Sequence, residues 1–103
     1  MKLFIIQTTF SDKKEAKKIG KLLIDNNLAA CVQITKIDSI YKWENQICED
    51  KEYLLSIKTK KENYKKIERK IKENHSYDLP QITAIKIKKS SDEYENYIKE
   101  NTI

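Results

Sequence analysis

Residues 41–59 read Tyr-Lys-Trp-Glu-Asn-Gln-Ile-Cys-Glu-Asp-Lys-Glu-Tyr-Leu-Leu-Ser-Ile-Lys-Thr and predict the centre of the fold. Apolar and aromatic side chains alternate with polar ones on both sides of Asn45-Gln46, as in two strands joined by a tight turn. Asn suits the turn because it reaches positive φ at low cost. Together with the residues before Tyr41, each strand is about 12 residues long, against a usual 5 or 6. A hairpin that overhangs a small sheet in this way indicates oligomerisation.

The composition bounds the class of protein. The chain has 103 residues, 36% of them charged and 39% hydrophobic, so a single domain over residues 1–103 is expected. No apolar run approaches the roughly 20 residues of a membrane span, and no signal-peptide pattern is visible. We therefore expect a cytoplasmic protein without a membrane partner. Cys31 and Cys48 fit that compartment as free thiols.

The charge pattern argues against a nucleic-acid reader. Of the 21 basic residues only Arg69 is an arginine, and 16 acidic residues are interspersed among them along the sequence. Nucleic-acid readers usually gather charge on one face and use Arg for bidentate contacts. We expect a Lys-rich solvated surface and no nucleic-acid partner, although a weak affinity for polyanions stays open.

Hydrophobic periodicity predicts the element order β-α-β-β-α-β-α. Leu3–Ile6 is apolar on both faces, which is typical of a central strand covered on both sides. The apolar parity changes along the second strand, so we expect a bulge or bend near Thr35-Lys36. The first helix is expected to end near Asn26-Asn27. Three pairs resemble capping boxes at helix starts: Asp12 with Glu15, Thr59 with Glu62, and Ser90 with Glu93.

This order predicts an α+β fold, a ferredoxin-like sandwich with one sheet, helices on one side and an extra C-terminal helix. Many unrelated functions share that fold, so the fold alone decides no function. An RNA-recognition module has the same order but needs a Lys/Arg-Gly-aromatic signature in its third strand. Residues 52–58 contain no Gly and only one aromatic residue, which disfavours that class.

Five pieces of the sequence together resemble the CutA divalent-cation tolerance family over nearly the whole chain. They are collinear and need no large insertion: Leu28-Ala29-Ala30-Cys31-Val32, Tyr41-x-Trp43, Glu52, Lys58-Thr59 and His75-x-Tyr77-x-x-Pro80. The resemblance implies a homotrimer in which the long hairpins pair between subunits, with divalent cations, copper foremost, as ligands. It also implies that exposed strand edges find partners in neighbouring chains.

Candidate metal ligands follow from the resemblance and from side-chain chemistry. Some family members bind copper through a first-strand Cys and adjacent histidines, and the matching positions here are Thr8 and Asn74-His75. His75 is the only histidine, and imidazole is a favoured copper ligand. The expected ligands are His75, Cys31 and Glu52. For His75 the alternative is a backbone anchor of its loop, and for Cys31 it is packing as a small hydrophobe.

The remaining family-matching residues are expected at a subunit interface or in a pocket between subunits: Tyr41, Trp43, Lys58, Tyr77 and Pro80. The sequence shows one His, no Gly-rich phosphate loop and no nucleophile motif, so we expect no enzyme activity. A trimeric signalling or scaffold protein akin to nitrogen-regulatory PII proteins, binding a small ligand between subunits, is the alternative function. That class uses a long ligand loop between the second and third strands, where this chain has a short turn.

Overall fold

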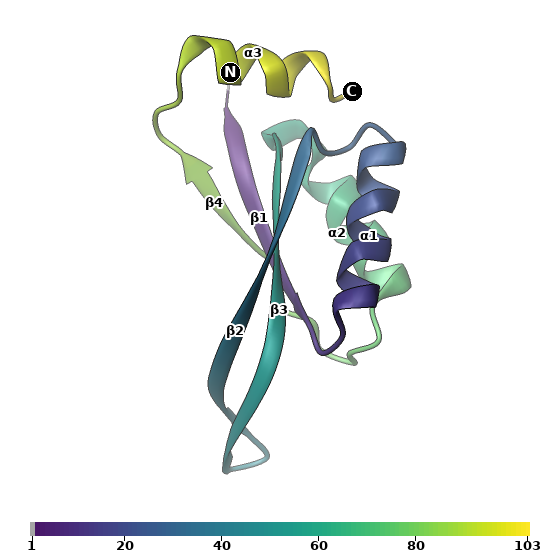
Figure 1. Ribbon diagram of the computed structural model, residues 1–103, viewed down its shortest axis with the longest axis vertical. Helices are drawn as coiled ribbons and strands as arrows, with labels where there is room; N and C mark the ends of the chain where they lie inside the picture. Colours follow the sequence, from purple (N-terminus) through teal and green to yellow (C-terminus); the bar gives the residue numbers. More distant parts are fainter. Residues whose placement is uncertain (1) are drawn as a thin grey trace.

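Four antiparallel strands form one sheet in the order β2-β3-β1-β4 in a computed structural model that describes residues 2–103. Helices α1 and α2 cover one face of the sheet, and α3 crosses one end (Figure 1). The predicted ferredoxin-like fold with its C-terminal helix is confirmed. The elements are β1 (Leu3–Phe10), α1 (Lys13–Asp25), β2 (Cys31–Trp43), β3 (Gln46–Lys60), a 3₁₀ turn (Lys61–Asn63), α2 (Tyr64–Asn74), β4 (Thr83–Ile87) and α3 (Asp92–Glu100).

The main core lies between the helices and the central strands. Helix α1 buries residues three and four positions apart, and α2 buries Ile67 and Ile71 four apart, so each helix presents one apolar stripe to the sheet. Gly20 allows α1 to approach β2 closely, because a Cβ there would meet Cγ2 of Val32 at 3.0 Å. The stripes pack on the buried strand residues Ile6, Phe10, Leu55 and Ile57.

Helix α3 closes the end of the sheet over a second, smaller cluster. Leu3, Ala30 and Ile98 are buried there, with Tyr94 packed against them. The Tyr97 hydroxyl donates to the Ala30 carbonyl at 3.1 Å, which ties α3 to the chain just before β2. Through this bond and the packing of Ala30 against Ile98, α3 holds the start of β2 in place.

The hairpin is longer than the rest of the sheet. Strand β1 pairs with β3 only as far as Phe10 opposite Tyr53, and beyond that rung β2 and β3 continue as a two-stranded ribbon, residues 37–52. Figure 1 shows this ribbon extending past both helices. The predicted overlong hairpin is therefore present, and no layer formed by residues 2–103 covers the ribbon.

Two details of the hairpin differ from the predictions. The turn is Glu44-Asn45, one residue earlier than predicted, with φ of 49° and 63°, as a type I′ turn requires. Of the bulge or bend predicted near Thr35-Lys36, the bulge is wrong, because the pairing runs unbroken from Cys31–Lys58 to Trp43–Gln46. The apolar parity changes there for another reason: the strand leaves the helix layer, so the helix-facing side no longer needs apolar residues.

The capping predictions hold in part. Asp12 caps α1 by accepting from the Lys14 N–H at 3.0 Å, and α1 ends at Asp25 with Asn27 at φ 56°, as expected. Glu15 does not complete that capping box, because its carboxylate binds Ser76 instead. The third box is displaced by one residue, since Ser91 caps α3 by accepting from the Tyr94 N–H.

Thr59 is not a helix cap. It lies inside β3, fully buried, and its hydroxyl donates to the Leu28 carbonyl at 2.6 Å. The Asn63 amide donates to the Thr59 hydroxyl at 3.2 Å, and a 3₁₀ turn precedes α2. The prediction failed because a buried acceptor from a distant loop outcompeted the local helix start.

Beyond the end that α3 covers, no element within residues 2–103 packs on the second face of the sheet, and this uncovered part is called the bare face. Ile5 and Ile85 are paired on that face, and Ile85 is 52% exposed although it is a large aliphatic residue. The prediction that Leu3–Ile6 is covered on both sides is confirmed in part: Leu3, on the same face as Ile5, is buried against Ile98 of α3, whereas Ile5 is only half-buried. No helix within residues 2–103 is long and apolar enough to cross a membrane.

Replacing Thr8 by valine is expected to stabilise the protein. The Thr8 side chain is fully buried, and its hydroxyl has no hydrogen-bond partner within residues 2–103. Exchanging an unpaired hydroxyl for a methyl group should raise the free energy of unfolding by about 1–2 kcal/mol, measurable as a higher Tm in thermal unfolding. Thr59→Val is the matched control and should lower the Tm, because it removes a bonded hydroxyl. A lower Tm for Thr8→Val would contradict the expectation.

Candidate functional site

His75 anchors the loop that follows α2. Its Nε2 lies 2.8 Å from the Thr9 carbonyl oxygen, and its Nδ1 accepts from the Tyr77 N–H at 3.1 Å. Because Nδ1 accepts, the proton of the neutral ring sits on Nε2 and is donated to Thr9. Both ring nitrogens are engaged, which is the backbone-anchoring arrangement considered as the alternative for this residue. A metal bound at His75 would require one of these two bonds to break.

Aromatic packing holds the same imidazole in place. The Phe10 ring stacks on His75 with centroids 4.3 Å apart and planes 11° apart, and the Tyr77 ring lies 4.8 Å away, tilted by 45°. Phe10 is fully buried at the end of β1. The loop is thereby fixed to the core at the rung where the ribbon begins.

Two carboxylates fasten the loop to its surroundings. Glu52, at the start of the ribbon, accepts from the Tyr77 hydroxyl at 2.8 Å. Glu15, on α1, accepts from the backbone N–H and the hydroxyl of Ser76, both at 2.8 Å. Sequence reasoning missed the Glu15–Ser76 contact, since no local pattern relates residues 61 positions apart.

Replacing Tyr77 by phenylalanine tests the Glu52 contact. Burial and the hydrogen bond to Glu52 raise the pKa of Tyr77 above its ordinary 10.0. Folding therefore favours the neutral phenol, and this stabilisation is present below pH 10 and lost as the pH rises through the folded-state pKa. We expect Tyr77→Phe to cost about 1 kcal/mol at pH 7, with the gap to wild type closing above pH 10 in urea unfolding. A gap that is constant with pH would contradict this.

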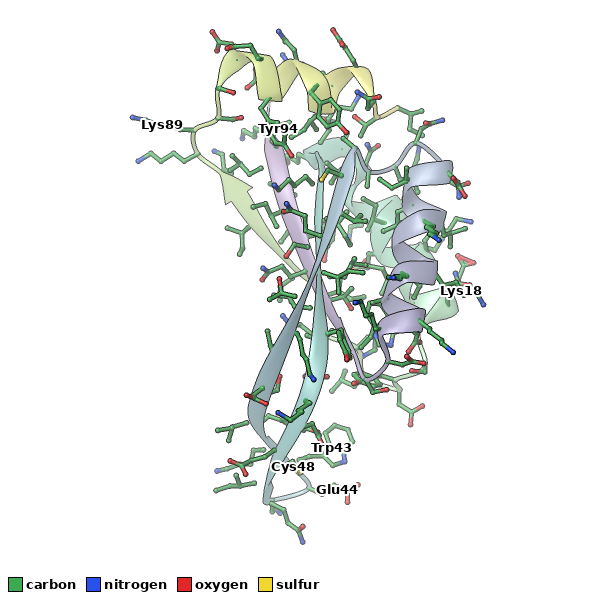
Figure 2. All side chains as sticks on the ribbon, viewed as in Figure 1. Lys18, Trp43, Glu44, Cys48, Lys89 and Tyr94 are labelled. Atoms are coloured by element: carbon green, nitrogen blue, oxygen red, sulfur yellow. The ribbon has the colours of Figure 1, made fainter. Side chains whose placement is uncertain are left out.

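A second pair of polar groups lies on the ribbon. The Tyr41 hydroxyl donates to Asp50, and this bond, with smaller contributions from burial and nearby charge, raises the pKa of Tyr41 to about 12. Tyr41 pairs opposite Cys48 on the same side of the ribbon as Trp43. Figure 2 shows Trp43 and Cys48 together near the hairpin tip. Tyr41 and Trp43 are 41% and 48% exposed, which is high for aromatic side chains.

Cys31 and Lys58 lie at the opposite end of the hairpin. They pair directly across β2 and β3, and the Lys58 ammonium lies 5.2 Å from the centre of the Tyr94 ring. Glu52 is six residues from Lys58 along β3, or about 20 Å at the rise of a strand. Cys31 is therefore not brought together with Glu52 and His75 within one chain. Residues 2–103 contain no group of three His, Cys, Asp or Glu side chains placed to hold a metal ion.

The structure therefore brings together only some of the predicted metal-ligand and interface residues. His75, Tyr77 and Glu52 are joined by stacking and hydrogen bonds, whereas Tyr41 and Trp43 occupy the ribbon. Pro80 is half-buried in the segment between His75 and β4, beside Leu79, which is 73% exposed. Fold and contacts define a small ferredoxin-like protein with a protruding hairpin and a tightly pinned loop at its base.

Comparison with known proteins identifies the family. The model of the CutA1 divalent ion tolerance protein family matches residues 4–101, so the chain belongs to that family. The divalent-cation tolerance protein CutA of Thermus thermophilus is 35% identical over 99 residues, which are 95% of this chain and 96% of the relative. The crystal structure of CutA1 from Oryza sativa has a TM-score of 0.96 at 33% identity, covering 100% of this chain and 95% of that one.

A second solved structure bears on the compartment. The structure described as the periplasmic divalent cation tolerance protein CutA from Archaeoglobus fulgidus has a TM-score of 0.93 at 36% identity, covering 98% of both chains. A chloroplastic CutA of Arabidopsis thaliana is 33% identical over 95% of this chain and 54% of its own length. Relatives named for different compartments leave the cytoplasmic location of this chain as a prediction.

Proposed function

We propose that this chain is a cytoplasmic homotrimer that binds divalent cations such as copper without turnover. The observation that carries the assembly is the bare sheet face together with the uncovered ribbon of residues 37–52. An exposed aliphatic residue such as Ile85 and unpaired strand edges favour burial against further copies of the chain. Membership of the CutA1 divalent ion tolerance family supports the proposal that the ligand is a divalent cation.

Residues 2–103 of one chain do not by themselves supply a metal centre. Both His75 nitrogens are bonded, and Cys31 is distant from Glu52 along the hairpin. We therefore propose that His75, Cys31 and Glu52 act as ligands only in combination between subunits, with His75 exchanging one backbone hydrogen bond for the ion. Glu52 suits this role because a carboxylate has acceptor capacity beyond its bond to the Tyr77 hydroxyl.

The interface is proposed to include Tyr41, Trp43, Lys58, Tyr77 and Pro80. The two aromatic residues of the ribbon support this, since exposed amphipathic rings are enriched where subunits meet. A PII-like signalling protein is disfavoured as the second function, because the two-residue turn at Glu44-Asn45 provides no ligand loop. Likewise, both ring nitrogens of His75 are held in hydrogen bonds with the backbone, which leaves neither free for acid-base turnover.

Native mass spectrometry of the tag-free protein, titrated with Cu²⁺, tests both parts of the proposal. A trimer that takes up about one ion per chain, and loses it in His75→Ala, is the expected result. Cys48→Ser is the matched control, because it removes a thiol that is not a proposed ligand. A trimer that stays without ions would overturn metal binding, and a monomer would overturn the assembly.

A further inference from the structure

The fold segregates charges that are interspersed along the sequence. Residues 13–25 and 61–74, which form the helix layer, contain eleven basic and five acidic residues, a net charge of +6. The rest of the chain contains ten basic and eleven acidic residues, a net charge of −1. The whole positive excess of the molecule therefore lies on the side of the sheet that α1 and α2 cover.

The basic residues form one outward surface. On each helix three of them repeat at spacings of four and three on the face opposite the buried stripe, so these three point away from the sheet. Figure 2 shows Lys18 on this outer side of α1. We define the helical basic surface as the exposed residues Lys14, Lys18 and Lys21 of α1 and Lys65, Arg69 and Lys72 of α2.

Acidic residues interrupt this surface little. The Glu15 carboxylate is bound to Ser76, and the Glu68 carboxylate accepts from the Tyr64 hydroxyl at 3.1 Å and lies 3.9 Å from the Lys65 ammonium. The three other acidic residues of the layer stand at or next to helix ends: Asp25, Glu62 and Glu73. Lys65, Arg69 and Lys72 line one shallow hollow together with Glu68 and Glu73. An extended anion can therefore contact several cations at once.

We propose that the helical basic surface binds the phosphate backbone of double-stranded nucleic acid without reading its sequence. A duplex carries one negative charge per roughly 1.7 Å of its axis, a density that several ammonium groups on a rigid layer can match. Arg69 is the only arginine, and Lys contacts phosphate as a point charge, so base readout is not expected. This proposal does not depend on the metal site or on the trimer.

The chemistry of the surface favours a duplex over the other polyanions. Single-strand binding needs aromatic platforms for the bases, and adsorption to a membrane is strengthened by apolar residues that insert. Of the described residues, none of the exposed large hydrophobic side chains lies on α1 or α2. The surface also lies opposite the bare sheet face, so assembly through that face leaves it accessible.

Fluorescence anisotropy with two labelled duplexes of unrelated sequence tests the proposal on the whole, tag-free protein. Both duplexes should bind with the same affinity, and the logarithm of the binding constant should fall linearly with the logarithm of KCl concentration between about 50 and 200 mM. The variant Lys18→Glu with Arg69→Glu should lose on the order of tenfold or more in affinity.

The control variant, Lys88→Glu with Lys89→Glu, has the same change of net charge on exposed residues between β4 and α3, where Figure 2 labels Lys89. It should lose clearly less affinity, and circular dichroism should show both variants folded. Equal losses in the two variants would overturn the proposal, as would no binding at about 50 mM KCl. Tighter binding to vesicles of anionic lipid than to the duplex at the same salt would also overturn it, in favour of a membrane surface.

Discussion

Replacing Phe10 by alanine is expected to lower the free energy of unfolding by about 3–5 kcal/mol. Phe10 is fully buried in the main core, and its ring stacks on His75 at 4.3 Å. The change therefore leaves a cavity and also removes the support of the loop that holds Tyr77. Urea unfolding should be measured at one fixed protein concentration, because association would add to the apparent stability.

Phe10→Leu separates the two contributions. Leucine keeps most of the buried apolar volume but cannot stack on His75, so a loss of about 1–2 kcal/mol is expected. Phe4→Leu is the matched control in the same strand, since the Phe4 ring makes an edge contact with Tyr64 and does not touch His75. Hydrogen exchange of residues 75–80 should rise in Phe10→Leu only. Equal exchange in both leucine variants would show that the stack does not hold the loop.

Much of the fold could be predicted because it depends on local patterns. The stripe of α1, the left-handed Asn27 at its end and the alternation of Thr83–Ile87 each follow from spacing and backbone preference. The missed features depend on residues far away in the sequence. In the sequence Thr59 matches a helix cap, but in the structure its hydroxyl donates to the Leu28 carbonyl. Glu15 matches the capping partner of Asp12, but its carboxylate binds Ser76. No window of sequence contains both members of these pairs.

The candidate site shows the same limit. The motif His75-x-Tyr77 could be found in the sequence, and His75 was expected either as a metal ligand or as a backbone anchor of its loop. The acceptor that occupies its Nε2 is the backbone of Thr9, and backbone groups carry no signature in a sequence. Phe10 could have been suspected only from its parity with Ile6 in β1. The sequence could thus single out His75 and Tyr77 as candidates, whereas their hydrogen-bond partners required the structure.

Replacing Ile85 by glutamate is expected to abolish the proposed assembly with little effect on the fold of a single chain. Ile85 lies on the bare face opposite Ile5 and is 52% exposed, so a carboxylate there remains hydrated in the monomer. Burying it against other copies would leave unpaired charges without water, at a cost of several kcal/mol per charge. Sedimentation equilibrium should show a trimer for wild type and a monomer for Ile85→Glu.

Ile103→Glu is the matched control for this experiment. It makes the same substitution at a residue of similar exposure, 57%, whose backbone N–H donates to Asn27 beyond the end of α1, away from the bare face. That variant should remain trimeric, and far-ultraviolet circular dichroism should show native helix content in both. If Ile85→Glu also stayed trimeric, the bare face would not be the buried one, and the uncovered ribbon of residues 37–52 would have to carry the contact alone.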